Sequence, residues 1–240
     1  MNIIITMAGE GSRFKKVGFS QPKHRLVVRG KSIFTWALTS LENFFSENFL
    51  FVTRLSNDDE PFIKEQCQNL GIEHFTVKTI DHLTSGQSAT VVAAEDLITY
   101  PEDKILIYNI DTYVEPDQLR PEWIKGTGWV PSFKAKGDKW SFVKFDEELK
   151  VYEITEKIRI SEYGTIGLYY FESYLLFKEC YQRFRYKNDQ EKYIAPLYSY
   201  ILNTLKFDVY THVVNANAVH VLGTPEDVAV FWPEFLNQKE

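Results

Sequence analysis

The sequence predicts an α/β fold, a Rossmann-like mixed and mainly parallel sheet with helices on both faces. Short apolar runs alternate with helix-like segments through the first half of the chain, an order typical of parallel β-α-β units. A chain of 240 residues, 44% of them hydrophobic, is long enough to bury such a sheet. We therefore expect one domain over residues 1–240, with ligands bound at the carboxyl ends of its strands.

The first half supplies the expected centre of the sheet. Strand-like apolar runs occupy residues 3–7, 49–53, 74–80 and 104–109. Segments with helical spacing connect them at residues 32–45, 58–70 and 87–98. Ser32 is a suitable N-cap for the first of these helices, and Gly71 can end the second.

The second half is richer in strands. Strand-like segments recur at residues 128–134, 141–145, 151–155, 164–171 and 207–212. Helices are expected at residues 173–184 and 193–205, and Pro225 fits the first position of a last helix. No flexible linker separates the two halves. We therefore expect the second half to extend the same sheet and to form the other wall of a cleft.

Composition and charge narrow the class of protein. A net charge of −6, from 27 basic and 33 acidic residues, argues against a nucleic-acid partner bound through a general basic field. Cys67 and Cys180 lie far apart in the sequence and lack the spacing of metal ligands. We therefore expect both to be reduced thiols in a cytoplasmic protein. No apolar run approaches the roughly 20 residues that span a bilayer, so no membrane insertion is expected.

A glycine-rich turn follows the apolar run at residues 3–7. Gly9 and Gly11 leave room for backbone N–H groups to approach phosphate oxygens. Arg13 and Lys23 add positive charge to the same region. The third glycine of a dinucleotide-binding motif is absent, and no Gly-Lys-Ser or Gly-Lys-Thr triad completes a P-loop. The turn is therefore expected to hold a nucleotide in another kind of phosphate-binding loop.

Residues 7–14, followed by Pro22 and Lys23, resemble the pyrophosphorylase motif of the sugar-phosphate nucleotidyltransferases. The sequence of residues 7–14 is most similar to that of family members from capsule and lipopolysaccharide gene clusters. These members include cytidylyltransferases of non-sugar phosphates. The resemblance implies a nucleotidyltransferase (GT-A-like) fold, with a nucleotide-binding half at residues 1–115 and an acceptor-binding half at residues 116–240. It implies catalytic roles for Arg13 and Lys23, and nucleotide-binding roles for Ala8, Gly9, Gly11 and Ser12. After Pro-Lys many relatives continue with Pro-Leu, whereas this chain has His24 and Arg25.

Asp111 comes directly after the strand-like run at residues 104–109. A carboxylate there can hold Mg²⁺ against a nucleotide phosphate, although an Asp after a strand is also a common turn residue. The family has an Asp at this step, so the resemblance implies that Asp111 is catalytic and binds Mg²⁺. Relatives carry a second metal-binding carboxylate at the closing turn of the fold, which corresponds to residues 222–225 here. The equivalent residue in this chain is Val221. The candidates to replace that carboxylate are Asn217, His220 and Asp227, and one carboxylate with phosphates and water is the alternative.

Gly86 and Gln87 stand at the start of the helix expected at residues 87–98. Gly86 permits close approach, and the Gln87 amide can both donate and accept hydrogen bonds. The alternative is an ordinary helix start with Ser85 as N-cap. In relatives a Gly-Gln or a nearby Gln contacts the base. The resemblance therefore implies that Gly86 and Gln87 bind the nucleotide, with a pyrimidine base favoured over a purine.

Glu156 and Lys157 follow the strand-like segment 151–155 and, taken alone, are typical of a solvated surface pair. They resemble the family's Glu-Lys pair, whose lysine binds the phosphate of the second substrate. Residues 163–171 resemble the strand that lines the acceptor, which implies acceptor-binding roles for Thr165 and Gly167. Residues 191–196 and 222–225 also resemble the family, as a helix start and as the closing turn.

The implied reaction joins an NTP to a small phosphorylated acceptor and releases pyrophosphate, with Mg²⁺ as cofactor. The expected NTP is CTP or another pyrimidine nucleotide. A sugar 1-phosphate is the default acceptor, and capsule or surface polysaccharide synthesis is the expected purpose. Phosphocholine or a phosphorylated amino acid such as phosphoglutamine is the alternative acceptor. A GT-A glycosyltransferase and an inactive nucleotide-binding paralogue are alternatives from other classes. Relatives are often dimers or tetramers, so a homo-oligomer is one possible state.

Overall fold

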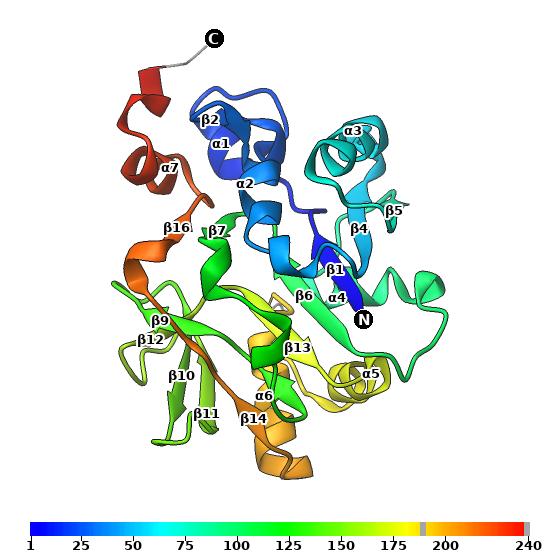
Figure 1. Cartoon of the computed structure of the whole chain (residues 1–240), viewed down its shortest axis with the longest axis vertical. Coiled ribbons are helices and arrows are strands. Elements are labelled where there is room, and N and C mark those ends of the chain that lie inside the picture. The colour runs from blue at the N-terminus through cyan, green and yellow to red at the C-terminus, as the bar shows by residue number, and fades with distance from the viewer. Residues whose placement is uncertain (188–190, 238–240) are drawn as a thin grey trace.

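The centre of the computed structural model, which describes residues 1–187 and 191–237, is a seven-stranded sheet of order β14-β8-β13-β6-β1-β4-β5. Four strands from the first half pair in parallel: β1 (Asn2–Thr6), β4 (Asn48–Arg54), β5 (Phe75–Ile80) and β6 (Ile105–Asn109). The second half adds three strands: β13 (Leu168–Phe171), antiparallel to β6, then β8 (Gly128–Trp129), antiparallel to β13, and β14 (Val209–Tyr210), parallel to β8. The predicted mixed, mainly parallel α/β sheet is confirmed (Figure 1).

Helices cover this sheet and link its strands. Their bounds are α1 (Ser12–Lys16), α2 (Ile33–Thr39), α3 (Glu60–Leu70), α4 (Gln87–Val92), α5 (Tyr174–Arg183), α6 (Ala195–Tyr200) and α7 (Pro225–Phe231). None of the helices in the described part of the chain is both long and apolar enough to cross a membrane.

The second half extends the first sheet through β13, β8 and β14, as expected, but it also forms a separate five-stranded sheet that the sequence did not predict. Its order is β11-β10-β12-β9-β15, and its strands are β9 (Ser132–Lys134), β10 (Ser141–Phe145), β11 (Val151–Glu156), β12 (Tyr163–Thr165) and β15 (Val213–Val214). Two predicted strands cross from one sheet to the other. The first breaks at Pro131, which cannot donate a backbone hydrogen bond. The second breaks at Gly167, whose φ of 82° is left-handed.

Two short antiparallel pairs complete the strands. β2 (Val27–Val28) pairs with β3 (Lys31–Ser32), and β7 (Thr112–Val114) pairs with β16 (Val219–Val221). The sequence did not predict them, because two or three residues are too few to establish a periodic pattern. The β7–β16 pair brings the closing turn at residues 222–225 next to the end of β6, since Leu222 N donates to Asp111 O at 2.8 Å.

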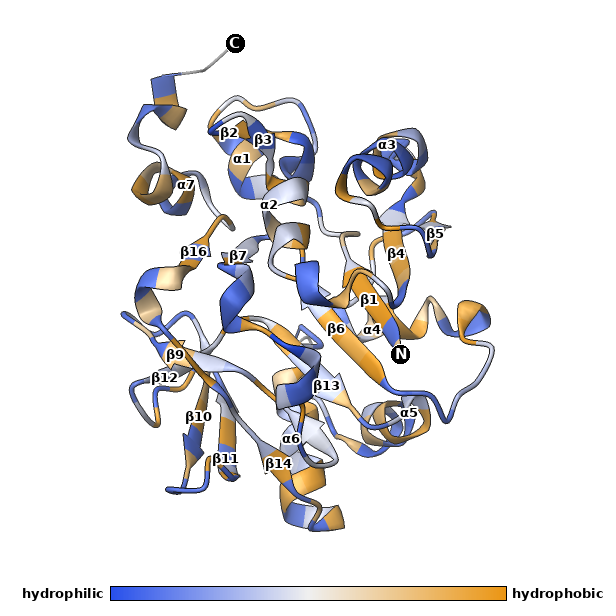
Figure 2. Ribbon diagram, in the orientation of Figure 1, coloured by the Kyte–Doolittle hydropathy of each residue, from blue (hydrophilic) through white to orange (hydrophobic). Residues whose placement is uncertain are grey.

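Alternation along β1 explains why both faces of the central sheet are apolar. Ile4 belongs to a buried cluster with residues of α4, α5 and α6. Ile3 and Ile5 belong to another cluster with residues of α2 and α3. Figure 2 shows the central strands β1, β4 and β6 in the orange of apolar residues. A strand buried on both faces reads as a continuous apolar run, as the sequence of β1 does.

The helix signals read from the sequence are present, but several helices are shorter than predicted. Ser32 Oγ accepts from Thr35 N at 3.0 Å, and Gly71 ends α3 with a φ of 76°. The helix predicted at residues 32–45 ends at Thr39, and a 3₁₀ turn follows it. The helix predicted at 87–98 ends likewise at Val92. Pro225 is the first residue of α7, as predicted.

A third apolar cluster connects the first loop of the chain to α7. Phe14 of α1 packs with Val228 and Phe231 of α7 and with Phe235 of the following turn. Phe19, in the loop after α1, stacks on Phe235 with ring centroids 4.9 Å apart. The glycine-rich turn that precedes α1 therefore rests on residues from both halves of the chain.

Asp59 is a fully buried carboxylate at the start of α3. Burial alone would raise the pKa of Asp59. The hydrogen bond and charge of His24, with hydrogen bonds from Thr53 and Arg25, instead lower it from 3.8 to about 2. Because the folded-state pKa lies below the unfolded one, the stabilisation from this group is complete above pH 3.8 and is lost as the pH falls through 2.

We expect Asp59→Asn to remove this contribution to stability. The difference in unfolding free energy between the wild type and the variant should shrink by about 2 kcal/mol between pH 4 and pH 2. Urea unfolding at several pH values in that window measures it. Asp58→Asn, the same change at the neighbouring exposed residue, is the control and should not change the pH dependence. A difference that stays constant over the window would contradict the prediction.

Candidate active site

A cavity of about 1000 Å³ lies at the carboxyl ends of the parallel strands β1, β4 and β6. Every residue that the sequence predicted for the site lines it: Ala8, Gly9, Gly11, Ser12, Arg13, Lys23, Gly86, Gln87, Asp111, Glu156, Lys157, Thr165 and Gly167. The structure thus brings together residues from both halves of the chain. Their individual roles stay predictions.

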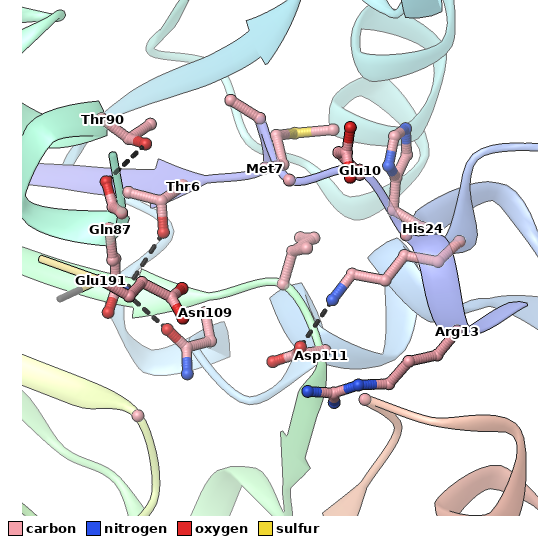
Figure 3. Close-up of a pocket in the computed structure, with 18 of the residues that line it drawn as sticks. Thr6, Met7, Glu10, Arg13, His24, Gln87, Thr90, Asn109, Asp111 and Glu191 are labelled. Carbon is pink, nitrogen blue, oxygen red and sulfur yellow. Dashed lines mark hydrogen bonds and ion pairs between the residues drawn. The ribbon is translucent and has the colours of Figure 1, made fainter. Parts of the chain in front are cut away.

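The glycine-rich turn forms one wall of this cavity. β1 ends at Thr6, and α1 begins at Ser12 after Gly11, whose φ of 63° is left-handed. A Cβ on Gly11 would lie 3.7 Å from the Cβ of Lys23, so the turn runs directly beside that lysine. Arg13 reaches from α1 into the cavity next to Asp111 (Figure 3).

Lys23 and Asp111 form an ion pair across the cavity. Lys23 Nζ donates to Asp111 Oδ2 at 2.6 Å, and both side chains are about one quarter exposed, at 20% and 27%. Lys23 lies on a short 3₁₀ turn after α1, whereas Asp111 follows β6. The pair places a mobile ammonium group beside a carboxylate at the end of a central strand.

Asp227 is the second carboxylate at this end of the cavity. It lies in the first turn of α7 and pairs with Lys139, whose Nζ is 2.5 Å from Asp227 Oδ1. A Cβ on Gly223 would lie 3.4 Å from Asp111 Oδ2 and 3.9 Å from Asp227 Oδ2. The two carboxylates therefore border the same glycine of the closing turn.

Three residues were candidates to supply the metal ligand that Val221 cannot provide, and of these Asp227 lines the cavity. His220 instead stacks on Tyr113, with ring centroids 5.4 Å apart, and Asn217 is exposed in a turn. Within the described residues, no three His, Cys, Asp or Glu side chains lie close enough together to hold a metal ion. Two carboxylates nevertheless fit Mg²⁺, which usually binds one or two carboxylates together with substrate phosphates and water.

Gln87 lies beside the ends of β1 and β6. Its Nε2 donates to Asn109 Oδ1 at 2.5 Å and to Thr6 Oγ1 at 3.2 Å (Figure 3). These bonds use the donor hydrogens of the amide and leave its oxygen without a described partner. The N-cap of α4 is Gly86, with no side-chain capping bond, so the alternative of an ordinary start capped by Ser85 is not what the structure shows.

Gly86 packs against the backbone of the segment before α6. Its φ is 141°, and a Cβ there would lie 2.5 Å from Lys192 N and 2.7 Å from Lys192 O. Lys192 N donates to Ser85 O at 2.8 Å, and Ser88 N donates to Lys192 O at 2.9 Å. The loop around Gln87 is therefore joined to the segment that carries Glu191 and Tyr193.

The predicted acceptor side of the cavity contains a buried polar chain. Ser141 Oγ donates to Glu156, whose side chain is 9% exposed, and lies 3.3 Å from the Tyr169 hydroxyl. That hydroxyl is 3.0 Å from Thr165 Oγ1. Burial raises the pKa of the Glu156 carboxyl, which the hydrogen bond from Ser141 and the charge of Lys157 partly offset.

Lys157 stands beside this chain in a left-handed conformation, with a φ of 55°. Its Nζ lies 4.0 Å from Glu156 Oε1, donates to the Tyr193 hydroxyl and sits 4.2 Å from the centre of the Tyr193 ring. The Tyr193 hydroxyl in turn donates to Glu191. Burial and the adjacent Glu191 raise the pKa of Tyr193. Lys157 is thus directed into the cavity by residues of the second half.

Asn109 and Lys139 line the cavity but were missed by the sequence reasoning. Asn109 is the last residue of β6, and an amide at the end of an otherwise apolar strand was the signal that could have identified it. Gly167 passes so close that a Cβ on it would lie 2.8 Å from Asn109 Cγ. Lys139 lies in the turn before β10 and carries no pattern that separates it from other surface lysines.

Comparison with solved structures gives two close likenesses. The nucleoside-diphosphate-sugar pyrophosphorylase from Vibrio cholerae RC9 superposes with a TM-score of 0.86 and 29% identity, over 99% of this chain and 100% of that one. The inositol-1-phosphate CTP transferase from T. maritima superposes with a TM-score of 0.78 and 15% identity, over 99% and 95% of the two chains. The second likeness concerns the fold alone.

Comparison with curated sequences finds the bifunctional protein GlmU of Methanocaldococcus jannaschii, 25% identical over 176 residues. The match covers 72% of this chain and 40% of that protein, so this chain corresponds to less than half of its relative. No model of a known protein family matches the chain.

Proposed function

We propose that this chain, an enzyme of the nucleotidyltransferase class, transfers the nucleotidyl group of an NTP to the phosphate of a small acceptor and releases pyrophosphate. The observation that carries the proposal is the shared cavity of Arg13, Lys23, Asp111 and Lys157, at the carboxyl ends of the central strands. Its basic groups come from both halves of the chain, as a reaction between two phosphorylated substrates requires.

In this proposal an oxygen of the acceptor phosphate attacks the α-phosphorus of the NTP. A new P–O bond forms, the bond from the α-phosphorus to the bridging oxygen breaks, and pyrophosphate leaves with the bond electrons. The acceptor phosphate is already ionised at neutral pH, so no general base is needed. Catalysis then depends on positioning and charge neutralisation. Arg13 and Lys23 would stabilise the leaving pyrophosphate, and Lys157 would hold the attacking phosphate.

Asp111, with Asp227 beside Gly223, would hold Mg²⁺. The ion, when bound, neutralises charge on the nucleotide phosphates. In that state the carboxylates no longer need Lys23 and Lys139 as their only partners. Both lysines would then be available to phosphate oxygens.

We propose CTP or another pyrimidine nucleotide as donor and a sugar 1-phosphate as default acceptor. The Gln87 oxygen can accept a hydrogen bond from a base N–H. The hydrogen-bonded side chains of Glu156, Ser141, Tyr169 and Thr165 offer a carboxylate and hydroxyls that suit the hydroxyl groups of a sugar or cyclitol. The names of the two similar structures, a sugar pyrophosphorylase and an inositol-1-phosphate CTP transferase, support this range. Phosphocholine and phosphoglutamine stay in the proposal as alternative acceptors, and capsule or surface polysaccharide synthesis in the cytoplasm as its setting.

The test is pyrophosphate release in the presence of Mg²⁺. We expect release with one of CTP, UTP, dTTP, ATP and GTP and with one acceptor from a panel of sugar 1-phosphates, inositol phosphate, phosphocholine and phosphorylated amino acids. Reactions that lack the acceptor are the control. A glycosyltransferase would release no pyrophosphate from any pair. A protein that binds a nucleotide but stays silent with every acceptor would contradict the proposal and favour the inactive paralogue.

A further inference from the structure

A buried cluster adjoins the turn that carries Lys23 and takes no part in the mechanism above. Its centre is Asp59, at the start of α3, whose side chain is fully buried. It is surrounded by Thr53, at the end of β4, and by His24 and Arg25, which follow Lys23 in the chain. These two positions are where the sequence departs from the Pro-Leu of many relatives.

Hydrogen bonds use both oxygens of the Asp59 carboxylate. His24 Nε2 lies 2.8 Å from Oδ1, and Arg25 donates to the same oxygen from Nε at 3.0 Å and from Nη2 at 2.8 Å. The hydroxyl of Thr53 donates to Oδ2. A buried carboxylate with this number of donors holds their positions firmly, because each lost bond would leave a polar group unpaired in the interior.

The bonds to Asp59 fix the position of the short turn that contains Lys23. Lys23, His24 and Arg25 are the whole of a 3₁₀ turn, closed by Arg25 N to Pro22 O at 2.9 Å and Leu26 N to Lys23 O at 3.2 Å. Lys23 reaches across the cavity to Asp111, whereas the His24 ring bonds the buried Asp59. A turn of three residues has few backbone bonds of its own, so the side chains of His24 and Arg25 fix its orientation.

Arg25 extends the same support to the rim of the cavity. Its Nη2 also donates to the carbonyl oxygens of Asn57 at 2.8 Å and Asp58 at 2.6 Å, and its guanidinium lies 5.2 Å from the centre of the Phe62 ring. Asn57 lines the cavity together with Ser56 and Arg54. The Arg25 guanidinium is therefore engaged by acceptors of the protein itself, and Lys23 is the cation of the turn that is free to meet a phosphate when Asp111 is otherwise bound.

We propose that Asp59 is a positioning residue for Lys23: it holds His24 and Arg25 so that the Lys23 ammonium is directed at the pyrophosphate part of the nucleotide. This inference rests on the proposed function, which places Lys23 at that group. Asp59 itself touches no substrate. It acts through the turn, and its effect on the reaction exists only while residue 23 is a lysine.

The experiment measures binding of inorganic pyrophosphate with Mg²⁺ by calorimetry, which needs no knowledge of the acceptor or base. Lys23→Ala should weaken binding by roughly ten- to hundredfold, since a hydrogen bond to a charged group is lost. Asp59→Asn should weaken binding about tenfold in the wild-type background, yet less than about twofold when Lys23→Ala is also present, because residues that act as a unit are not additive. Asp58→Asn is the matched control and should bind like the wild type.

Arg25→Lys provides a second variant if Asp59→Asn does not fold. It keeps the positive charge but loses the planar group that bonds Asp59 and the two carbonyls, and it should show the same dependence on Lys23. Equal losses in both backgrounds would indicate general destabilisation and overturn the proposal. Weakening by Lys23→Ala but by neither supporting variant would also overturn it, with the proposed function intact. A wild type that binds no pyrophosphate would instead overturn the proposed function itself.

Discussion

Replacing Lys23 with alanine is expected to lower kcat/KM for nucleotidyl transfer by about two to three orders of magnitude, the typical cost of removing one preorganised charged donor. The ammonium group lies 2.6 Å from Asp111 Oδ2 and within reach of any phosphate beside the glycine-rich turn. Its loss would leave the negative charge that develops on pyrophosphate without this partner. Steady-state kinetics with the donor and acceptor identified by the release assay measure the effect.

Lys16→Ala is the matched control for this prediction. It removes the same charge from an exposed residue at the end of α1 that does not line the cavity. Its kcat/KM should stay within about twofold of the wild type, since surface substitutions rarely matter. Thermal unfolding of both variants separates loss of catalysis from loss of fold. Activity of Lys23→Ala within a few-fold of the wild type would exclude a catalytic role for Lys23.

Gly86→Ala is expected to abolish most activity and to destabilise the protein by about 2 to 5 kcal/mol, from the strained backbone and the steric overlap together. The new Cβ would lie within 2.9 Å of three backbone atoms of Lys192. Backbone atoms cannot rotate away as a side chain can, so the bonds that join Lys192 to Ser85 and Ser88 would have to open. That movement would displace Gln87 on one side and Tyr193 on the other. Urea unfolding and the release assay measure the two effects.

Gly137→Ala separates the two causes. Gly137 likewise has a positive φ, 73° against 141° at Gly86, but a Cβ there would meet no atom within 4 Å. This variant should therefore cost only the backbone strain, about 1 to 2 kcal/mol. If both alanine variants lost the same stability, the packing of Gly86 on Lys192 would be unimportant.

The central sheet was predictable because its physical signal is local. The run at residues 3–7 is apolar on both faces, which is how a strand covered on both sides must read. The helix ends at Ser32 and Gly71 were predictable for the same reason, since a cap depends on neighbouring residues. The second sheet was not predictable in this way. The breaks at Pro131 and Gly167 redirect two strands, and where a redirected strand finds its partner depends on distant residues.

The site followed the same rule. The glycine-rich turn and Lys23 came from a motif with fixed spacing, and Asp111 came from its place directly after a strand; the structure places all three around one cavity. Asp227 was one of three candidates, and the β7–β16 pair, which sets the closing turn beside β6, is what brings its carboxylate to the cavity. The burial of Asp59 was not foreseen. A carboxylate at a helix start is normally exposed, and its burial depends on His24 and Arg25 arriving from a segment more distant in the chain.

The packing of Phe14 and Phe19 on Phe235 has a consequence for the order in which the protein folds. The glycine-rich turn is synthesised well before Phe235, the aromatic residue that packs on Phe14 of α1 and on Phe19. The parallel strands β1, β4, β5 and β6 are all synthesised before Phe235, so they can pair while this loop still lacks that partner. The cavity beside the glycine-rich turn is then completed later than the pairing of these strands. Newly made chains would pass through a period in which they are largely compact but unable to bind their substrate.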